Sequence, residues 1–279
     1  HGYGVTPAQP FWQQKALIAL ERMVGRITTH WVAVSQADRR QGIEWGLFTA
    51  SKVSVVRPGI DPTAFAARIE SPERDRLRAM LGVAPDQLLV GTVSCLKPQK
   101  SPEDFVRVAA LVCQRVPAAR CVLVGDGALR PKVEALLLAQ GLQDRVTLLG
   151  WRRDVAALLK AFDVFVLTSQ WEGLPCAILE ARASRIPIVA TRVGGAAEAI
   201  VEGIQGTLCP AGDVRAMAER VCQILEDERF RADLRAGMQE LPEEFTIQET
   251  LKQYQSIYAY LLHATRPSED VMKLQPNRL

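Results

Sequence analysis

Residues 164–181 read VFVLTSQWEGLPCAILEA and predict the repeating unit of the fold. Val164–Thr168 is an apolar run of strand length, and Cys176–Ser184 has the composition of a helix. Pro175 suits the first turn of that helix, because the N–H that proline lacks would have no helical partner there. The stretch therefore predicts a buried strand, a short loop and a helix in succession.

The same succession repeats along the chain. Runs rich in Val, Ile and Leu rarely alternate with polar residues, which is typical of strands covered on both faces in a parallel sheet. Strands alternating with helices predict an α/β fold, a Rossmann-like doubly wound parallel sheet. Ligands of such sheets bind at the carboxyl ends of the strands. We expect strands at Trp31–Ser35, Lys52–Val56, Leu88–Ser94, Arg120–Gly125, Arg145–Leu149, Val164–Thr168 and Pro187–Ala190, and helices at Phe11–Arg26, Pro102–Val116, Leu129–Ala139, Val155–Ala161, Cys176–Ser184, Ala196–Val201, Ala216–Leu225 and Thr246–Leu262.

Two boundaries divide the chain. Arg57-Pro58-Gly59-Ile60-Asp61-Pro62 is a cluster of chain-breaking residues directly after a strand. The segment from Thr265 has little apolar content and is expected to be disordered. The chain begins with His1 rather than Met, so we expect it to be part of a longer protein. The predicted parts are residues 1–56, a self-contained α/β domain at 57–245, and a final helix with its tail at 246–279.

The composition disfavours several classes of protein. Lys and Arg number 34 against 31 Asp and Glu, whereas nucleic-acid binders usually carry a marked basic excess, so no nucleic-acid partner is expected. The 6 cysteines form no C-x-x-C pair and predict buried thiols in a reducing compartment. The 3 histidines lie far apart in the sequence, and no metal site is predicted. No apolar stretch reaches the roughly 18 residues of a membrane span.

Two acids flank the start of the helix that follows Pro175. The first amides of that helix, at Cys176 and Ala177, have no helical acceptor, and the positive helix end favours anions. Glu172 precedes the helix and Glu180 lies within it. Ionised carboxylates accept strong hydrogen bonds from hydroxyl groups, so the pair is suited to a ligand that carries hydroxyls and an anion. The alternative is two solvated surface acids, which the position at a strand end disfavours.

Glu172-Gly173-Leu174-Pro175, followed by Glu180, resembles the E-x7-E signature of the family 4 retaining glycosyltransferases, the glycogen-synthase-like group with the GT-B fold. Other pieces follow in the order that this family shows. Each piece alone is weak, but their order and spacing are jointly specific. The pieces are Val34-Ser35, Arg57-Pro58-Gly59-Ile60-Asp61, Leu123-Val124-Gly125-Asp126-Gly127, Val146 to Gly150 with Asp154-Val155, Ala190-Thr191-Arg192-Val193-Gly194-Gly195 with Glu198, and Cys209-Pro210-Ala211-Gly212-Asp213.

The resemblance implies a role for each matching residue. Glu172 is the candidate catalytic residue that contacts the donor sugar, and Glu180 would bind the ribose hydroxyls. Lys100, also a catalytic candidate, matches the lysine that binds the diphosphate, and Lys97 offers a second cation. The remaining donor-binding candidates are Gly173, Leu174, Pro175 and Cys176 at the helix start, Gly125, Asp126, Gly127 and Asp154 in loops expected to hold the base and ribose, and His1, which matches a histidine facing the donor sugar.

The chain departs from the family pattern at three positions. Cys95 stands where an arginine is expected to neutralise the leaving diphosphate. Lys97 would compensate only partly, because a point-charge ammonium does not reproduce a guanidinium fork. Ser101 replaces a glycine, and Arg185 stands where the family prefers a glycine ahead of an x-Pro pair.

The implied reaction moves a sugar from a UDP- or GDP-sugar to a glycan or lipid-linked acceptor with retention of anomeric configuration, in cell-envelope or exopolysaccharide synthesis. The resemblance implies that the reaction needs neither a metal nor another cofactor. It also implies a cytoplasmic location, with the inner face of the cell membrane as one alternative. Peripheral contact of basic residues with anionic lipid is one interpretation, and a solvated helix face is the other. We expect the chain alone to bind nucleotide and to turn over slowly. The basic residues are Arg22, Arg26, Arg39 and Arg40.

Two alternatives stay open. A degenerate, non-catalytic module that binds nucleotide-sugars is supported by Cys95. A GT-B sugar-nucleotide epimerase would share the sheet but should lack E-x7-E in this setting. A Rossmann-type dehydrogenase is disfavoured, because Gly125-Asp126-Gly127 lacks the third glycine of G-x-G-x-x-G and Arg130 occupies that place.

Overall fold

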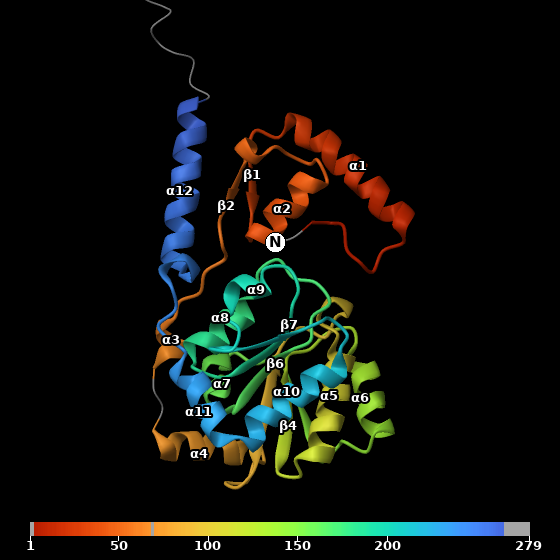
Figure 1. The fold of residues 1–279 in the computed structure, drawn as a ribbon, viewed down its shortest axis with the longest axis vertical. Helices are drawn as coiled ribbons and strands as arrows, with labels where there is room; N and C mark the ends of the chain where they lie inside the picture. Colours follow the sequence, from red (N-terminus) through yellow and green to blue (C-terminus); the bar gives the residue numbers. More distant parts are fainter. Residues whose placement is uncertain (1–2, 68–69, 265–279) are drawn as a thin grey trace, which may run out of the picture.

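The computed structural model describes residues 3–67 and 70–264. Within them, six parallel strands form the main sheet in the order β5-β4-β3-β6-β7-β8, and β1 pairs with β2 in a separate parallel sheet (Figure 1). The predicted doubly wound parallel sheet is confirmed. The strands are β1 (Trp31–Ala33), β2 (Val53–Val55), β3 (Leu88–Val93), β4 (Ala119–Val124), β5 (Val146–Gly150), β6 (Val164–Leu167), β7 (Ile188–Thr191) and β8 (Gly206–Cys209).

Helices cover both faces of the main sheet. Successive side chains of a strand point to opposite faces, so Leu123 joins one hydrophobic cluster and Val122 the other. Both faces are apolar, which explains why the strands show no polar alternation in the sequence. One face is covered by α5 (Pro102–Arg115), α6 (Arg130–Ala139) and α10 (Val214–Glu226), and the other by α7 (Val155–Ala161), α8 (Cys176–Ala183) and α9 (Ala196–Ala199).

The carboxyl ends of β3 and β6 mark the point where the chain changes direction across the sheet. From β3 the chain proceeds through β4 to β5 on one side, and it then returns so that β6 pairs with β3 on the other, with Val90 opposite Val164. Loops diverge at such a point and leave a crevice between them. The crevice here lies between the loop 94–101, which contains the 3-10 turn Pro98–Lys100, and the loop 168–175.

A buried acid fastens two outer helices to the sheet. Asp163, just ahead of β6, is bound by Arg74 at 2.9 Å and Arg78 at 3.0 Å from one helix and by Arg235 at 3.3 Å from another. The amide of Leu89 on β3 donates to the same carboxylate at 2.8 Å. The two helices are α4 (Ser71–Met80) and α11 (Glu228–Ala236), and the short helix α3 (Thr63–Ala66) precedes them.

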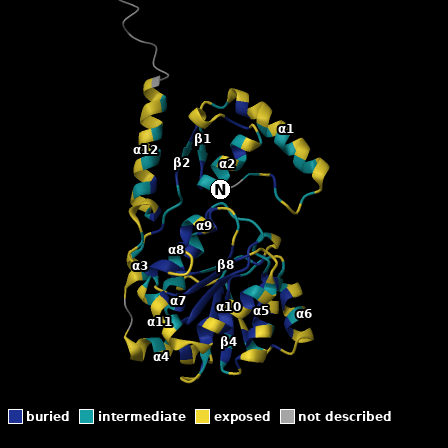
Figure 2. Ribbon diagram, viewed as in Figure 1, coloured by how far each residue is buried: buried dark blue, intermediate teal, exposed yellow. Residues whose placement is uncertain are grey.

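The N-terminal segment lies above the carboxyl edge of the main sheet (Figure 1). It has a small core of its own, which includes Leu47 and Phe48. Burial is concentrated in the main sheet, and α1 is mostly exposed (Figure 2), with Trp12 at 72% of its accessible area. The last helix rises beside β2, and Thr250 donates its hydroxyl to the Arg57 carbonyl at 2.8 Å. The helices concerned are α1 (Phe11–Ile27), α2 (Gln36–Glu44) and α12 (Ile247–Ala264), with 3-10 turns at Ala50–Lys52 and Glu243–Phe245.

Apart from the 3-10 turns, five elements differ from the sequence prediction. We did not predict α2, α3, α4, α11 or β8, and the predicted elements otherwise match the observed ones with ends shifted by one or a few residues, as helix and strand ends commonly are. For α2 a signal was present, because Ser35 caps the helix by accepting the amide of Asp38 at 3.0 Å, the S-x-x-D pattern. His1 and the tail from Thr265 lie outside the described residues.

Candidate active site

The two loops of the crevice are joined to each other by backbone contacts. The amide of Gln170 donates to the Gln99 carbonyl at 2.7 Å. The hydroxyl of Thr168 lies 3.0 Å from the carbonyls of both Lys100 and Ser101. The loop after β3 therefore takes its position from the end of β6, and the side chains of both loops are presented as one unit.

Lys100 and Glu172 form a largely buried ion pair between these loops, with side chains 16% and 6% exposed. The carboxylate oxygen that contacts Lys100 also accepts the hydroxyl of Ser169 at 2.6 Å. The other oxygen is 3.4 Å from the side-chain amide of Gln99. Three donors thus hold Glu172 in one orientation, which is the preorganisation that a binding or catalytic carboxylate requires.

Glu180 lies on α8, one helix turn beyond the first turn. Burial raises the pKa of its carboxyl, and no described residue supplies an ion pair or hydrogen bond to it. A half-buried carboxyl without a partner loses part of its hydration, and a ligand that supplies donors would compensate for that loss. Hydroxyl groups of a ligand would do so.

The thiol of Cys176 shows that these charges share one small region. Burial raises its pKa, the charges of Glu180 and Glu172 add to the increase, and Lys100 opposes it. All three ionisable side chains therefore lie within electrostatic reach of the first residue of α8. The amides of this first turn, at Cys176 and Ala177, have no helical acceptor, so a positive helix end faces the same place.

A glycine pair allows a third loop to close onto the site. A Cβ at Gly194 would lie 1.8 Å from the Glu172 carbonyl, and φ at Gly194 is +48°. The amide of Gly195 donates to the Gly173 carbonyl at 2.6 Å. Only glycine permits this approach of the β7–α9 loop, which packs against Gly173 and Leu174 at the helix start.

The loop after β4 is fixed against the loop after β3. A Cβ at Gly125, where φ is +133°, would lie 2.0 Å from the Ser94 carbonyl, and one at Gly127 would lie 2.6 Å from the Leu96 carbonyl. Asp126 binds Arg130 at 2.8 Å and the amide of Gly127 at 2.8 Å. The predicted residues of this loop are therefore adjacent to the crevice, with the Asp126 carboxylate engaged by its own loop.

The structure separates two other predicted residues from the ion pair. Lys97 is exposed to solvent, unlike Lys100 three residues on. Asp154 follows β5, two strands away from β3, and pairs with Arg152 at 2.6 Å near the surface. His1 lies outside the described residues, and its predicted role stays a prediction.

A cavity of about 700 Å³ opens from the crevice toward the N-terminal segment. Glu172 and Gly173 lie on its lower wall with Gln99, Trp171 and Gly194. No pattern in the sequence indicates the opposite wall, because its residues are far away from Glu172 along the chain. That wall consists of Tyr3, Val5, Thr6, Pro7, Gln14, Ala37, Asp38, Gln41 and Trp45.

The sequence pattern of the family described as "Glycosyl transferases group 1" matches residues 73–240, more than half of the chain. The chain belongs to this family. The matched region contains the whole crevice, from Lys100 to Glu198, including the E-x7-E pair.

Two curated relatives of this glycosyltransferase chain are similar over most of its length. The UDP-Gal:alpha-D-GlcNAc-diphosphoundecaprenol alpha-1,3-galactosyltransferase of Escherichia coli is 30% identical over 212 residues, 75% of this chain and 54% of the relative. The N-acetyl-alpha-D-glucosaminyl L-malate synthase of Bacillus anthracis is 32% identical over 184 residues, 66% of this chain and 48% of the relative. The chain spans about half the length of these relatives.

Solved structures agree with the GT-B assignment. HepE of Anabaena in complex with UDP-glucose superposes with a TM-score of 0.80 and 26% identity, covering 91% of this chain and 70% of HepE. WaaG, a glycosyltransferase involved in lipopolysaccharide biosynthesis, has a TM-score of 0.77 over 90% of this chain and 70% of WaaG. At 18% identity, WaaG supports the fold alone.

At two of the positions where this glycosyltransferase chain departs from the family pattern, the backbone has a positive φ angle. Ser101, with φ +44°, and Arg185, with φ +56°, are the non-glycine residues of the described chain that have positive φ. Both stand where the family resemblance leads us to expect glycine. The chain therefore keeps the left-handed backbone at these turns and tolerates a Cβ that disfavours it.

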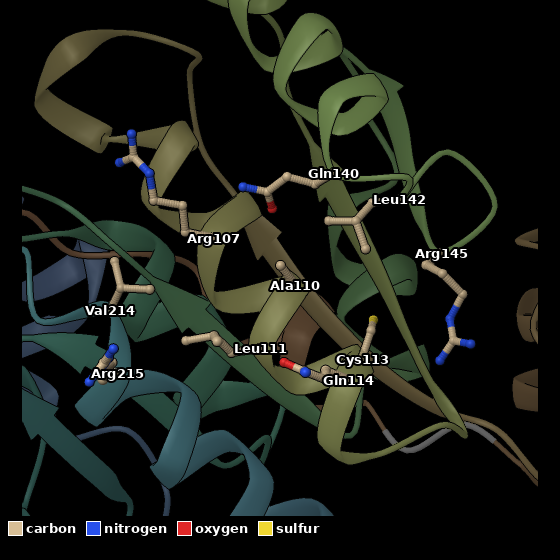
Figure 3. Close-up of a pocket in the computed structure, with 10 residues that line it drawn as sticks. All are labelled: Arg107, Ala110, Leu111, Cys113, Gln114, Gln140, Leu142, Arg145, Val214 and Arg215. Atoms are coloured by element: carbon tan, nitrogen blue, oxygen red, sulfur yellow. The ribbon is translucent and has the colours of Figure 1, made fainter.

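Another hollow, of about 740 Å³, lies across the outer side of α5 (Figure 3). Three arginines (Arg107, Arg145 and Arg215) line it, with Cys113 beside them. A hydrogen bond from the Cys121 thiol lowers the pKa of Cys113, and Arg145 adds to the effect. None of the predicted site residues lines this groove, so its size does not make it the candidate active site.

The described residues bring together no group of His, Cys, Asp and Glu side chains suited to a metal ion. No helix among them is sufficiently long and apolar to traverse a bilayer.

Proposed function

We propose that this protein transfers a sugar from a UDP-sugar to a hydroxyl of a glycan or lipid-linked acceptor, with retention of anomeric configuration. The observation that carries the proposal is the convergence of Lys100, the first turn of α8, Glu172 and Glu180 on one crevice at the carboxyl edge of the sheet. HepE, 26% identical, was crystallised with UDP-glucose, and the Escherichia coli relative is named for UDP-Gal, which favours UDP over GDP.

The proposed division of labour follows from charge. Lys100 and the free amides of α8 would stabilise the diphosphate as it leaves, a preorganised electrostatic role. Glu180 would accept hydrogen bonds from the ribose hydroxyls, which give its half-buried carboxyl the donors that the described residues do not supply. Glu172, oriented by Lys100 and Ser169, would accept donor-sugar hydroxyls rather than attack the anomeric carbon. Retention would then proceed on the front face through an ion-pair-like state.

The acceptor would enter through the cavity between the two parts of the chain. We propose that residues 1–56 belong to an acceptor domain, that residues 57–245 bind the donor, and that α12 crosses back between them. The name of the Escherichia coli relative includes a diphosphoundecaprenol, which supports a lipid-linked acceptor and a role in envelope or exopolysaccharide assembly. A location at the inner face of the membrane follows from that proposal.

A binding module without transferase activity is the second candidate, and Cys95 favours it. Cys95 is half-buried in the loop where the resemblance implies an arginine, so this loop has less positive charge for a diphosphate. If the chain is a decayed enzyme, Cys95→Arg should raise transfer strongly. If the chain is an active enzyme adapted to cysteine, the variant should leave transfer within about threefold of wild type.

Nucleotide binding and product formation test the two candidates together. Thermal shifts with UDP, GDP, ADP and dTDP identify the base, since a ligand at a hundred times its dissociation constant adds about 2.7 kcal/mol to the free energy of unfolding. Radiolabelled UDP-hexoses then report release of free or transferred sugar. UDP binding with sugar release supports the transferase, and UDP binding without any release supports the module. Lack of binding by all four nucleotides contradicts both.

A further inference from the structure

The cavity wall that faces Glu172 has an unusual charge pattern. Among the described residues, its lining contains two carboxylic acids, Asp38 on the N-terminal segment and Glu172 below it, and no Lys, Arg or His. The two acids are not equivalent. Glu172 has its oxygens bound by Lys100, Ser169 and Gln99. For Asp38, the hydrogen bond that the described residues supply comes from the Ser35 hydroxyl.

Asp38 lines the cavity, and two hydrogen bonds hold its backbone in place. Its amide donates to the Ser35 hydroxyl oxygen at 3.0 Å in the first turn of α2, and its carbonyl accepts the Tyr3 hydroxyl at 2.6 Å. Burial raises the pKa of Asp38 to about 6, and the charge of Glu198 adds to the increase. At pH 7.5 the group is therefore mainly ionised and has the capacity to accept hydrogen bonds.

Aromatic rings flank the acid. Trp45 and Tyr3 meet edge to face, with ring centroids 5.3 Å apart, on the same wall as Asp38. Trp171 lies on the wall that carries Glu172. Binding cavities combine such apolar surfaces with a few polar groups that fix orientation. A sugar ring presents an apolar face to an indole and hydroxyls at its rim, which matches this arrangement.

Charge excludes a different kind of ligand. An anionic group placed beside two carboxylates in a partly buried cavity has unfavourable Coulomb energy. A bound donor increases this repulsion, because its diphosphate adds further negative charge near Glu172. Lys100, at the cavity floor, is already paired with Glu172.

We propose that Asp38 selects the acceptor. Its carboxylate accepts a hydrogen bond from a hydroxyl of a neutral sugar ring that packs against Trp45 and Trp171. The same carboxylate repels acceptors that carry a carboxylate or phosphate on that ring. This inference rests on the proposed function, since it names the chemical class of acceptor that the same site takes. Asp38 is thereby a specificity-determining residue that touches the substrate.

Saturation-transfer NMR on the protein with UDP bound tests the proposal. The probes are matched pairs that differ in one group, methyl glucoside against methyl glucuronide and methyl galactoside against methyl galacturonide. At pH 7.5 we expect at least one neutral glycoside to bind and its uronide partner to bind about tenfold more weakly. Asp38→Asn, which keeps the shape of the side chain, should reduce that difference to less than threefold. Asp144→Asn, an exposed acid outside the cavity, should retain it.

The outcomes separate this inference from the function beneath it. Equal binding of a neutral glycoside and its uronide overturns the inference, as does a difference that survives Asp38→Asn in a variant whose melting temperature shows that it is folded. Binding of UDP without any glycoside overturns it as well. If UDP itself does not bind, the proposed function is contradicted, and the inference about the acceptor is contradicted with it because it depends on that function.

Discussion

The carboxylate of Glu198, in the short helix α9, accepts the backbone amide of Ala37, in the first turn of α2, at 2.9 Å. The amide of Gln36 donates to the same carboxylate at 3.0 Å, and Arg57 binds it at 2.9 Å. One side chain of the main α/β domain thus caps a helix of the N-terminal segment and holds the chain that connects the two. Because Asp38 follows in the same turn, this contact sets the wall of the cavity opposite Glu172.

We expect Glu198→Ala to loosen α2 locally. The amides of Gln36 and Ala37 lose their acceptor, and loss of a cap costs about 1 kcal/mol. Hydrogen exchange should show these two amides exchanging about fivefold faster. Asp213→Ala is the matched control, because Asp213 caps α10 through the amide of Ala216 at 3.0 Å. The control should lower stability without changing exchange at 36 and 37, and an equal effect of both variants contradicts the interpretation.

Lys100 and Lys97 should contribute differently to nucleotide binding. Lys100 is mostly buried in the crevice beside Glu172, where we propose that the diphosphate binds, whereas Lys97 is exposed. Lys100→Met should raise the dissociation constant for UDP by about tenfold or more, because a charge-assisted contact in a shielded site is lost. Lys97→Met should change it less than threefold. Calorimetric titration of both variants with UDP measures the two dissociation constants. An equal loss of affinity in both variants would contradict the assignment of the diphosphate contact to Lys100.

Arg185→Gly should stabilise the protein. Arg185 follows the C-cap of α8 with φ +56°, its amide donates to the Arg182 carbonyl at 2.9 Å, and the amide of Ile186 donates to the Ala181 carbonyl at 3.1 Å. These bonds form a Schellman motif, in which glycine normally takes the left-handed position. Glycine removes about 1–2 kcal/mol of strain from the folded state. It also increases the entropy of the unfolded chain, which lowers the free energy of unfolding by about 0.5–1 kcal/mol.

The expected net gain of Arg185→Gly is about 1 kcal/mol, or roughly 2–4 °C in melting temperature. Arg185→Ala is the control, because alanine keeps the Cβ and the strain. Calorimetry should show a gain for glycine and none for alanine. A gain of the same size with both residues would place the effect in the loss of the arginine side chain rather than in the backbone.

Asp163 should make the protein sensitive to acid. Burial alone would raise the pKa of this carboxyl, but the Leu89 amide and the charges of Arg74, Arg78 and Arg235 outweigh it, and the net pKa is lowered. A depressed folded-state pKa means that the contribution to stability is fully present above the unfolded pKa, near pH 4. It is lost as pH falls through the folded value.

Asp163→Asn should therefore lower the free energy of unfolding by about 3 kcal/mol at pH 7, because three arginines lose their buried counter-charge. The variant should also lose less further stability than wild type between about pH 5 and pH 2. Urea unfolding across this range measures both effects. Asp75→Asn, an exposed acid on α4, should match wild type, and an Asp163→Asn protein as acid-sensitive as wild type contradicts the assignment.

The fold was largely predictable because its main determinant is local. Each strand of the main sheet is apolar on both faces, and this composition is visible without knowledge of its neighbours. The helix α4 was missed because Arg74 and Arg78 attach it to Asp163 by ion pairs across more than 80 residues of sequence, rather than through an apolar stripe. Strand β8 is short and begins at Gly206, where a Cβ would lie 2.1 Å from the Ile188 carbonyl.

The site was predictable only where a motif is continuous. Glu172 and Glu180 stand on one strand–loop–helix unit, so they are separated by only eight positions in the sequence. The partners that orient Glu172 and the wall that contains Asp38 come from distant segments, so no spacing in the sequence relates them. Resemblance to the family placed Lys100 in the crevice, but it did not indicate that Asp38 and Glu172 line one cavity whose described residues include no Lys, Arg or His.

The proposed donor site is best tested by a crystal structure of the protein soaked with a UDP-sugar. We expect the diphosphate within hydrogen-bonding distance of Lys100 and the first amides of α8, the ribose hydroxyls on Glu180, and the sugar beside Glu172. A nucleotide bound instead in the arginine-lined groove along α5, or one whose ribose leaves Glu180 without a partner, would contradict it.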